Sequence, residues 1–557
     1  MVGGGADLLD SPKKGENSDF ESPENDEKTE EYTVTYKTYN DYFTDLNISK
    51  ETITSDDFVG TGSEANPFVV RSIRGLLYLT RYYNYTSISL DNKYLKLDCD
   101  IVLNEEKFDE DGNPSGGDGV VYEWSPIGAS LKLFDGQNHT ISGMWKKTDS
   151  EGEDSTSFFK RNKTIGLFKD VKFENVYVEN QGALSYNSVL AYDVKTMENV
   201  DLLSGTFKTK TSYSATFCVF LYNSITNCNN YVNVYTTAQS CSGMVCELRG
   251  IIANCNNYGN ITSQVSSTTN GRVAGLVVYS SQTSKIIDCT NYGNICTNDQ
   301  QAGGICVWVY ATIISGCKNY GEIEAGGFIG GGIAGSCYNQ NNTKTIYDCQ
   351  NYGKIIARKE QPYRYGEIIG SITVGNGTVH IVNCEGSSSS AVALVGTVED
   401  ANVSIKNSKV NMKFESLDTN YFNLILGLVN RAEAHINNLE INVDCEKLKA
   451  ARLFTNVKVD YANVHLKNII INLKCKSLQK TTIGIENCPN INIDGLLLNY
   501  KIGQTTKKEY YGIDFSGFYS NWKSGKIGLK ALDGSGFMQT TIDKDILESK
   551  GYKQIVV

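Results

Sequence analysis

Short stretches of alternating apolar and polar residues, each closed by a turn, recur along the chain. Five copies of one motif stand in the middle of the sequence: NCNNYVNV from Asn227, NCNNYGNI from Asn254, DCTNYGNI from Asp288, GCKNYGEI from Gly316 and DCQNYGKI from Asp348. NCEG at Asn383 is a sixth, degenerate copy. The spacing of their cysteines is 27, 34, 28, 32 and 35 residues, in the order Cys228, Cys255, Cys289, Cys317, Cys349 and Cys384. One solenoid coil per repeat, with loops of variable length, is the prediction.

A second motif lies between these copies and reads as a short apolar strand entered through Gly. Its copies are SGMVC (242–246), AGLVV (274–278), GGICV (303–307) and GGIAG (331–335). Such strands are too short to offset alone a backbone entropy of roughly 1–2 kcal/mol per residue, whereas stacked coils share one core. The pattern therefore predicts an all-β, right-handed parallel β-helix. We expect the Gly of Asn-Tyr-Gly to supply positive φ at a corner, and the asparagines to form a ladder.

The pattern also divides the chain. Residues 1–31 are acidic and predict a disordered tether, and 32–92 predict a strand-like lead-in element and an N-terminal cap, with Leu76, Leu77 and Leu79 on a helix that plugs the solenoid. Residues 93–388 carry the Cys-x-Asn-Tyr-Gly coils, 389–538 predict the same β-helix with shorter coils, and 539–557 predict a C-terminal cap.

Composition narrows the classes of partner. The formal net charge of −11 argues against nucleic acid, whose phosphates need clustered Lys and Arg. No apolar run is long enough to span a bilayer. No secretory signal is visible, so we expect either that a signal was removed or that export uses another route.

The six repeated cysteines are expected to point inward and to act as small, reduced, buried apolar residues, a structural ladder. Disulfides between coils are the alternative, since stacked strands lie about 4.8 Å apart. Metal binding is less favoured, because no Cys-x-x-Cys pair occurs and only His139, His380, His435 and His465 offer nitrogen ligands.

Three groups of residues are candidates for function. A file of tyrosines at one corner predicts a surface that binds sugar rings or a protein groove if exposed, and core if buried: Tyr231, Tyr258, Tyr292, Tyr320 and Tyr352. The loop DEDGNPSGGDG carries Asp109, Asp111, Asn113 and Asp118, spaced loosely like a calcium loop but without its closing Glu. A solvated turn is favoured over structural Ca²⁺, and no other cofactor is expected.

Carboxylates at equivalent coil positions form the third group. Glycan-cleaving β-helices place two or three carboxylates on one face. Asp288 and Asp348 occupy equivalent positions, and Glu322 lies near a corner in the coil between them. Acidic residues on a solenoid more often serve only to solvate it, so we assign no catalytic residue.

Together the blocks resemble bacterial surface proteins with GLUG-type repeats. The resemblance rests on GTGSEANPFVV, GLLYL, KYLKLDCDIVL, WSPIG, FDGQNHTISG and IGLFKDV in that order, followed by the Cys-x-Asn-Tyr-Gly and Gly-Gly-Ile-Ala-Gly copies, and covers roughly Gly60 to Ile355. It implies a β-helical, adhesin-like protein. The chain departs from some members of the group in having no wall anchor, protease domain or His-Glu-x-x-His motif.

Three functions follow as hypotheses. The first is a non-enzymatic, extracellular cell-surface protein, with a lipid-modified cysteine before its tether, that binds a glycan or a host or cell-surface protein. The second is a virion component such as a phage tail fibre or spike, which predicts a homotrimer. The third is a polysaccharide lyase or glycoside hydrolase built on the β-helix.

Overall fold

The computed structural model describes residues 34–505 with short gaps, together with 512–514 and 527–531. The gaps are 86–89, 116–118, 149–155, 183–185, 238, 265–270, 299–300, 312, 328, 339–341, 358–363, 374, 376, 418–421, 450, 456–461, 479–481 and 487–489. The predicted tether (1–31), the predicted C-terminal cap (539–557) and Asp118 lie outside the described residues.

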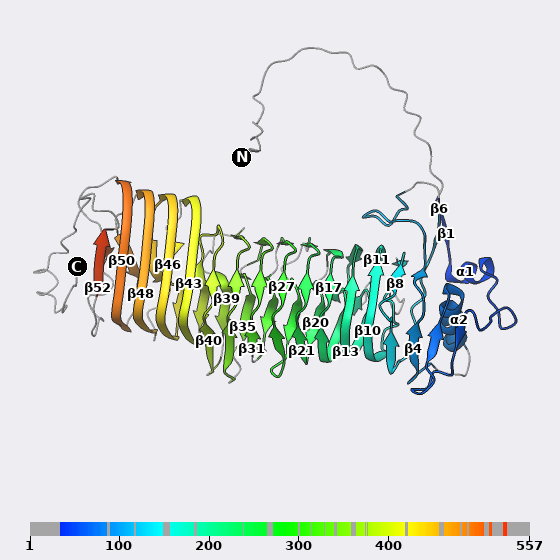
Figure 1. Cartoon of the computed structure of the whole chain (residues 1–557). Coiled ribbons are helices and arrows are strands. Elements are labelled where there is room, and N and C mark those ends of the chain that lie inside the picture. The colour runs from blue at the N-terminus through cyan, green and yellow to red at the C-terminus, as the bar shows by residue number, and fades with distance from the viewer. Residues whose placement is uncertain are drawn as a thin grey trace, which may run out of the picture.

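The described residues form a β-solenoid of about 12 turns, which confirms the predicted all-β, parallel β-helix. Figure 1 shows an elongated stack with two helices at its blue end and long strands at its orange end. Nearly every strand pairs in parallel with its equivalent one coil away, and β2–β3 is an antiparallel pair at the N-terminal end.

The N-terminal end begins with β1 Val34–Lys37, α1 Tyr39–Asp45, β2 Phe58–Val59, β3 Phe68–Val70 and α2 Ile73–Tyr85. Leu76, Leu77 and Leu79 on α2 are fully buried, and α2 covers the end of the stack as predicted (Figure 1). The strand-like pattern after β1 gives way to α1, because Thr38 and Asp41 form a capping box. Neither described helix is long and apolar enough to cross a membrane.

The first coils use strands of varied length. They are β4 Tyr94–Leu97, β5 Ile101–Val102, β6 Gly119–Tyr122, β7 Leu133–Asp135, β8 Thr140–Ser142, β10 Thr164–Glu174, β13 Ala191–Leu202 and β16 Cys218–Thr226. Strand β6 pairs with β1 and so joins the lead-in element to the stack.

A coil of the repeat region contains five short strands in a fixed order. The following strands come first, and the last two of them contain Gly: β12 Tyr186–Ser188, β15 Tyr213–Ala215, β19 Ser240–Ser242, β24 Arg272–Ala274, β29 Gln301–Gly303 and β34 Gly330–Gly331. The apolar strands follow: β20 Val245–Leu248, β25 Val277–Ser280, β30 Cys306–Val309, β35 Ala334–Tyr338 and β39 Tyr365–Thr373.

The strands that flank each cysteine come next: β21 Ile251–Ala253, β26 Lys285–Ile287, β31 Ile313–Ser315, β36 Lys344–Tyr347 and β40 Thr378–Val382 before it, and β17 Asn229–Asn230, β22 Asn256–Asn257, β27 Thr290–Asn291, β32 Lys318–Asn319, β37 Gln350–Asn351 and β41 Glu385–Gly386 after it. The last strand of each coil belongs to a separate eight-stranded sheet: β9 Trp145–Thr148, β11 Val176–Asn180, β14 Gly205–Thr209, β18 Asn233–Thr236, β23 Ile261–Ser263, β28 Ile295–Thr297, β33 Ile323–Ala325 and β38 Ile355–Ala357.

The six cysteines of the repeat are buried and free. Each thiol donates to the carbonyl two residues earlier, as in the 3.2 Å contact from Cys255 Sγ to Ala253 O. Burial raises the pKa of Cys289 and Cys317 well above the usual range, so these side chains are neutral thiols.

An asparagine ladder runs beside the cysteines through the core. Each Nδ2 donates to Oδ1 of the next coil's asparagine, at 2.7, 2.8, 2.8 and 2.8 Å along the series Asn230, Asn257, Asn291, Asn319 and Asn351. All five residues are fully buried. The amides satisfy one another, so the core tolerates polar groups that would otherwise be costly to bury.

The prediction that the Gly of Asn-Tyr-Gly supplies the positive φ at the corner is wrong. Positive φ falls on the residue before each cysteine, for example Asn254 at 53° and Asp288 at 50°, and not on the Gly of Asn-Tyr-Gly. That Gly is needed for space, because a Cβ on Gly321 would lie 2.0 Å from the carbonyl oxygen of Gly293 in the coil before. Asn, Asp and Gly are the residues that adopt the left-handed conformation most readily.

The solenoid changes shape at β43 Asn402–Leu417. Its first part pairs with β40 and then β41, but the strand continues straight for seven residues where earlier coils turn. The long strands β46 Glu433–Leu448, β48 Asn463–Leu478 and β50 Asn490–Thr505 repeat this form, and the shorter strands between and beyond them are β42 Ala393–Glu399, β44 Phe422–Asn423, β45 Leu426–Asn430, β47 Ala451–Thr455, β49 Thr482–Glu486, β51 Gly512–Asp514 and β52 Ile527–Ala531.

Coil length varies in this part of the chain: the coil from Thr378 to its partner Asn402 is 24 residues long, and the predicted shortening does not continue evenly after it. Asn402 pairs with Glu433, Glu433 with Asn463, and Asn463 with Asn490, so the coils are 31, 30 and 27 residues long. The difference lies in the strands, which are longer because the tight corner after the Asn-Tyr pair is gone.

Replacing Asn319 by Ala tests the ladder. The change removes the next-coil acceptor of the Asn291 amide and the donor to Asn351 Oδ1, so we expect a loss of about 2–4 kcal/mol in unfolding free energy. Asn260→Ala, which removes a 2.9 Å bond at an exposed corner, is the matched control and should cost under about 1 kcal/mol. Urea denaturation followed by circular dichroism measures both, and equal losses would contradict the ladder's role.

Candidate functional site

The five predicted tyrosines form one stacked file on the surface. Successive ring centroids are 4.3, 4.7, 5.1 and 4.9 Å apart, with interplanar angles of 2°, 3°, 4° and 18°. Four of the rings are 37–44% exposed, namely those of Tyr231, Tyr292, Tyr320 and Tyr352. Because each ring covers the face of the next, the file presents ring edges and hydroxyl groups to solvent, and not the flat faces that sugar stacking requires.

The tyrosine file continues as a line of hydroxyl and amide side chains. Tyr352 N donates to Asn319 O, and Ser387 N donates to Asn351 O in the same way, so Ser387 occupies the next position of the file. Asn411 Nδ2 then donates to Ser387 Oγ at 2.8 Å. Asn442 donates to Asn411 at 2.9 Å and Asn472 to Asn442 at 2.6 Å. We call this continuous set of side chains the Tyr–Asn line.

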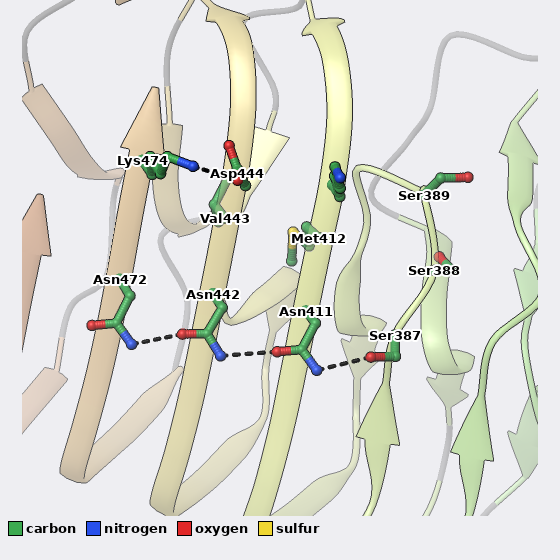
Figure 2. A pocket seen from close by; sticks show the side chains of 11 residues that line it. Ser387, Ser388, Ser389, Asn411, Met412, Asn442, Val443, Asp444, Asn472 and Lys474 are labelled. Atoms are coloured by element: carbon green, nitrogen blue, oxygen red, sulfur yellow. Dashed lines mark hydrogen bonds and ion pairs between the residues drawn. The ribbon is translucent and has the colours of Figure 1, made fainter. Parts of the chain in front are cut away.

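A groove of about 600 Å³ lies beside the amide half of the line. Figure 2 shows the amides of Asn472, Asn442 and Asn411 in a row that ends on Ser387, with Lys474 and Asp444 above them. The lining residues are Ser387, Ser388, Ser389, Asn411, Met412, Lys413, Asn442, Val443, Asp444, Asn472 and Lys474. The groove therefore combines amides, hydroxyls, an ion pair of 2.8 Å between Lys474 and Asp444, and two apolar side chains.

The groove arises from the change in coil shape. The serines belong to the last coil that turns after its Cys motif, whereas Asn411, Asn442 and Asn472 lie on strands that run straight on. The step between a turning coil and straight ones leaves the space. The sequence marks the position by the degenerate copy NCEGSSSS, in which the Asn-Tyr pair is lost.

A buried carboxyl group lies directly under this step. Gly386 takes the ladder position after Asn351, and Glu367 fills the space that its missing side chain leaves. Asn351 Nδ2 donates to Glu367 Oε2 at 2.6 Å, and Glu367 Oε1 lies 2.5 Å from the hydroxyl of the groove residue Ser388. Burial raises the pKa of Glu367 to about 8, although the two hydrogen bonds oppose the shift.

In the loop considered as a calcium site, the acidic side chains form hydrogen bonds and an ion pair within the protein. Asp109 Oδ1 accepts from the backbone amides of Asp111 and Asn113, both at 2.9 Å. Asp111 pairs with Lys208, and the amide of Asn113 contacts Asp109 Oδ2 at 3.3 Å. These side chains are thus engaged within the turn and with Tyr36 and Lys208 outside it, and Asp118 lies outside the described residues.

The three carboxylates weighed for catalysis occupy two different corners. Asp288 and Asp348 hold the left-handed position before their cysteines, and Asp348 Oδ1 accepts from Asn383 at 3.2 Å. Glu322 stands at the next corner, where its backbone amide donates to Asn294. Asp recurs at the first corner because it adopts the left-handed conformation readily.

One cluster of potential metal ligands appears among the described residues: Glu433, His435 and His465. Sequence alone identifies both histidines only as available nitrogen donors, because 30 residues separate them and their juxtaposition depends on coil register.

Comparisons with known proteins give little further guidance. No family model matches the chain, and no curated protein matches it. A crystal structure described as "a putative immunoglobulin A1 protease from Bacteroides ovatus" is similar over 47% of this chain and 79% of that chain, with 17% identity and a TM-score of 0.35. A likeness of this size carries no argument about function.

Glu367→Gln tests the buried carboxyl group through pH. The folded-state pKa lies above the ordinary value of 4.5, so the stability that the neutral acid contributes is present below about pH 4.5 and is lost as pH rises through about 8. We expect the urea midpoint of the unmodified protein to fall over this range. Gln does not titrate, and its oxygen can accept from Asn351 while its NH₂ group donates to Ser388 Oγ, so it should remove that part of the fall. Glu385→Gln, at a half-buried position nearby, is the control, and equal pH profiles for all three proteins would contradict the assignment.

Proposed function

We propose that this protein is a non-enzymatic surface protein that binds an extended glycan along the Tyr–Asn line. The observation that carries the proposal is the shared register of the line, in which Tyr352, Ser387 and Asn411 occupy one column. A column that changes from aromatic to amide side chains without leaving the surface suits a ligand that runs along the solenoid axis.

The chemistry of the line suits a hydroxyl-rich polymer. Partial burial raises the pKa of Tyr258 and Tyr352, so their hydroxyls are neutral donors and acceptors at physiological pH. The groove adds amides and serine hydroxyls, which pair with sugar hydroxyls in either direction. Met412 and Val443 also line the groove, but both are buried, so contacts to a glycan would come from the polar side chains.

Ring orientation defines how the tyrosines would take part. Their stacked faces are unavailable, so they would contact the glycan through hydroxyls and edges. Tyr352 differs, because it has a tyrosine on one side and the small Ser387 on the other. We propose that its face toward Ser387 stacks on one sugar ring at the point where the file meets the amides.

Sequence supports the location. The ordered blocks that resemble GLUG-type surface proteins favour an extracellular, adhesin-like role, with the tether joining the solenoid to the cell. No feature of the described structure favours the virion or the polysaccharide-cleaving hypotheses over this one.

Two variants test the glycan proposal. After a screen of the full chain on an array of neutral and acidic polysaccharides, calorimetry on the best ligand should show binding at least about tenfold weaker for Ser389→Trp, because the exposed serine lines the groove and an indole would fill it. Tyr292→Phe should weaken binding less, since it removes one hydroxyl and keeps the stack.

Matched controls place the same changes elsewhere. Thr283→Trp puts an indole on another exposed loop, and Tyr347→Phe removes the hydroxyl of a tyrosine that is 37% exposed outside the file. Both should bind as the unmodified protein does. An array on which the protein shows no glycan above background, or a hit that Ser389→Trp leaves unchanged, would refute the proposal.

A further inference from the structure

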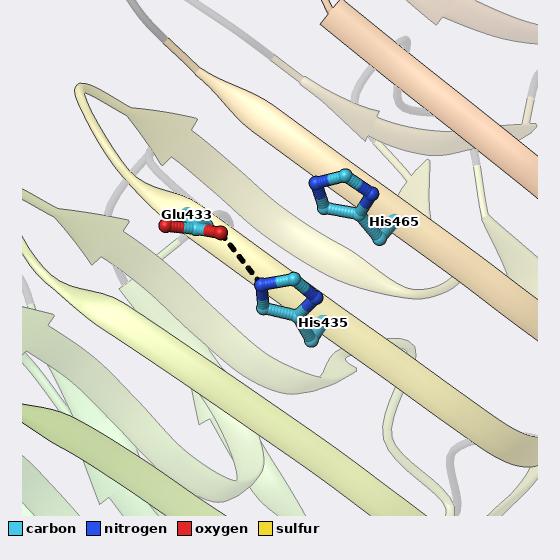
Figure 3. Close-up of side chains that lie close together, drawn as sticks. All are labelled: Glu433, His435 and His465. Carbon is cyan, nitrogen blue, oxygen red and sulfur yellow. Dashed lines mark hydrogen bonds and ion pairs between the residues drawn. The ribbon is translucent and has the colours of Figure 1, made fainter.

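We propose that Glu433, His435 and His465 bind one divalent transition-metal ion, of which Zn²⁺ is the natural probe. Each residue offers a ligand atom, and the three atoms all lie within 4.8 Å of one another. Figure 3 shows the two imidazole rings side by side on neighbouring strands, with the carboxylate of Glu433 beside His435.

Strand geometry brings the three side chains together. Glu433 and His435 are two residues apart on β46, so they point to the same face. His465 on β48 is the direct partner of His435 in the parallel ladder. The rings therefore stack, with centroids 4.5 Å apart and an interplanar angle of 6°. His435 Nε2 already lies 2.7 Å from Glu433 Oε1.

The ligand types select the class of metal. Neutral imidazoles with one carboxylate suit Zn²⁺ and its first-row neighbours better than Ca²⁺ or Mg²⁺, which prefer oxygen alone. Bond lengths to Zn²⁺ are about 2.0–2.2 Å, so the more distant ligand atoms need to draw together by roughly 1 Å, and Glu433 and His435 need to exchange their hydrogen bond for bonds to the metal. The side chains of His435 and Glu433 are 53% and 46% exposed, and such a rotation meets little packing resistance.

Three protein ligands leave one coordination position open. The site would clamp two successive coils and hold a water molecule or a ligand atom at the open position. It lies seven residues along β46 from the groove residue Asn442, so it is independent of the proposed glycan groove.

Neighbouring coils show that the cluster is local to this pair of strands. In the same column, Ser404 precedes His435 and Asn492 follows His465. In the column of Glu433, the neighbours are Asn402 and Asn463. His380 shares the histidine column but faces Ser404, so it has no second imidazole beside it.

Zinc binding to the full chain tests the proposal. Calorimetry with ZnCl₂ should give one site per chain for the unmodified protein. His435→Ser and His465→Asn insert residues that the adjacent coils already carry in this column, and each should weaken binding at least about tenfold. His380→Asn is the matched control and should bind as tightly as the unmodified protein.

Two further readouts separate this site from metal binding at the cysteines and from a general loss of structure in the variants. The absorbance of the Co²⁺ form should lack a thiolate charge-transfer band, which excludes the cysteines as ligands. Glu433→Gln, which keeps the size of the side chain, should also weaken binding while circular dichroism stays unchanged. Absence of saturable binding, a thiolate band, or unchanged affinity in the folded histidine variants would overturn the assignment.

Discussion

In-register parallel stacking is the constraint on which the rest of this structure depends. Each side chain lies on the side chain at the same position one coil away, about 4.8 Å distant. A residue type that interacts well with itself is therefore favoured within a column. Cysteine, asparagine and tyrosine meet this condition in three different ways: as a thiol bonded to its own strand, as an amide that both donates and accepts, and as a ring that stacks.

The same constraint explains how a polar core is tolerated. An amide ladder satisfies each member except the last, which needs a different partner. Here the last donor, Asn351, meets a carboxyl group that burial keeps largely protonated below its raised pKa. The end of the ladder coincides with the loss of the Asn-Tyr pair at 383–387, the end of the tyrosine file and the groove. The loss of this pair thus accounts for three structural features: the end of the ladder, the end of the tyrosine file and the groove.

Sequence reasoning could predict the solenoid, the N-terminal plug and the asparagine ladder, because all three depend on residue type at a repeated spacing. It misplaced the positive φ, since whether Gly259 or Asn254 turns the chain depends on how closely the neighbouring coil approaches. The sequence also did not show whether the tyrosines of the file expose their ring edges or their ring faces to solvent. It also missed the cluster of Glu433, His435 and His465, because pairing His435 with His465 requires the register of strands that carry no Cys motif.

Because the groove lies at the end of the tyrosine file, repeat coils can be added or removed before it without changing the groove. The groove depends on one turning coil and the straight strands after it, whereas each coil before it contributes one ring. Unequal recombination between the near-identical copies, such as those at Asn254 and Asp288, would lengthen or shorten the file in steps of about 4.8 Å. The length of the tyrosine file can therefore vary between related proteins while the groove at its end keeps its shape.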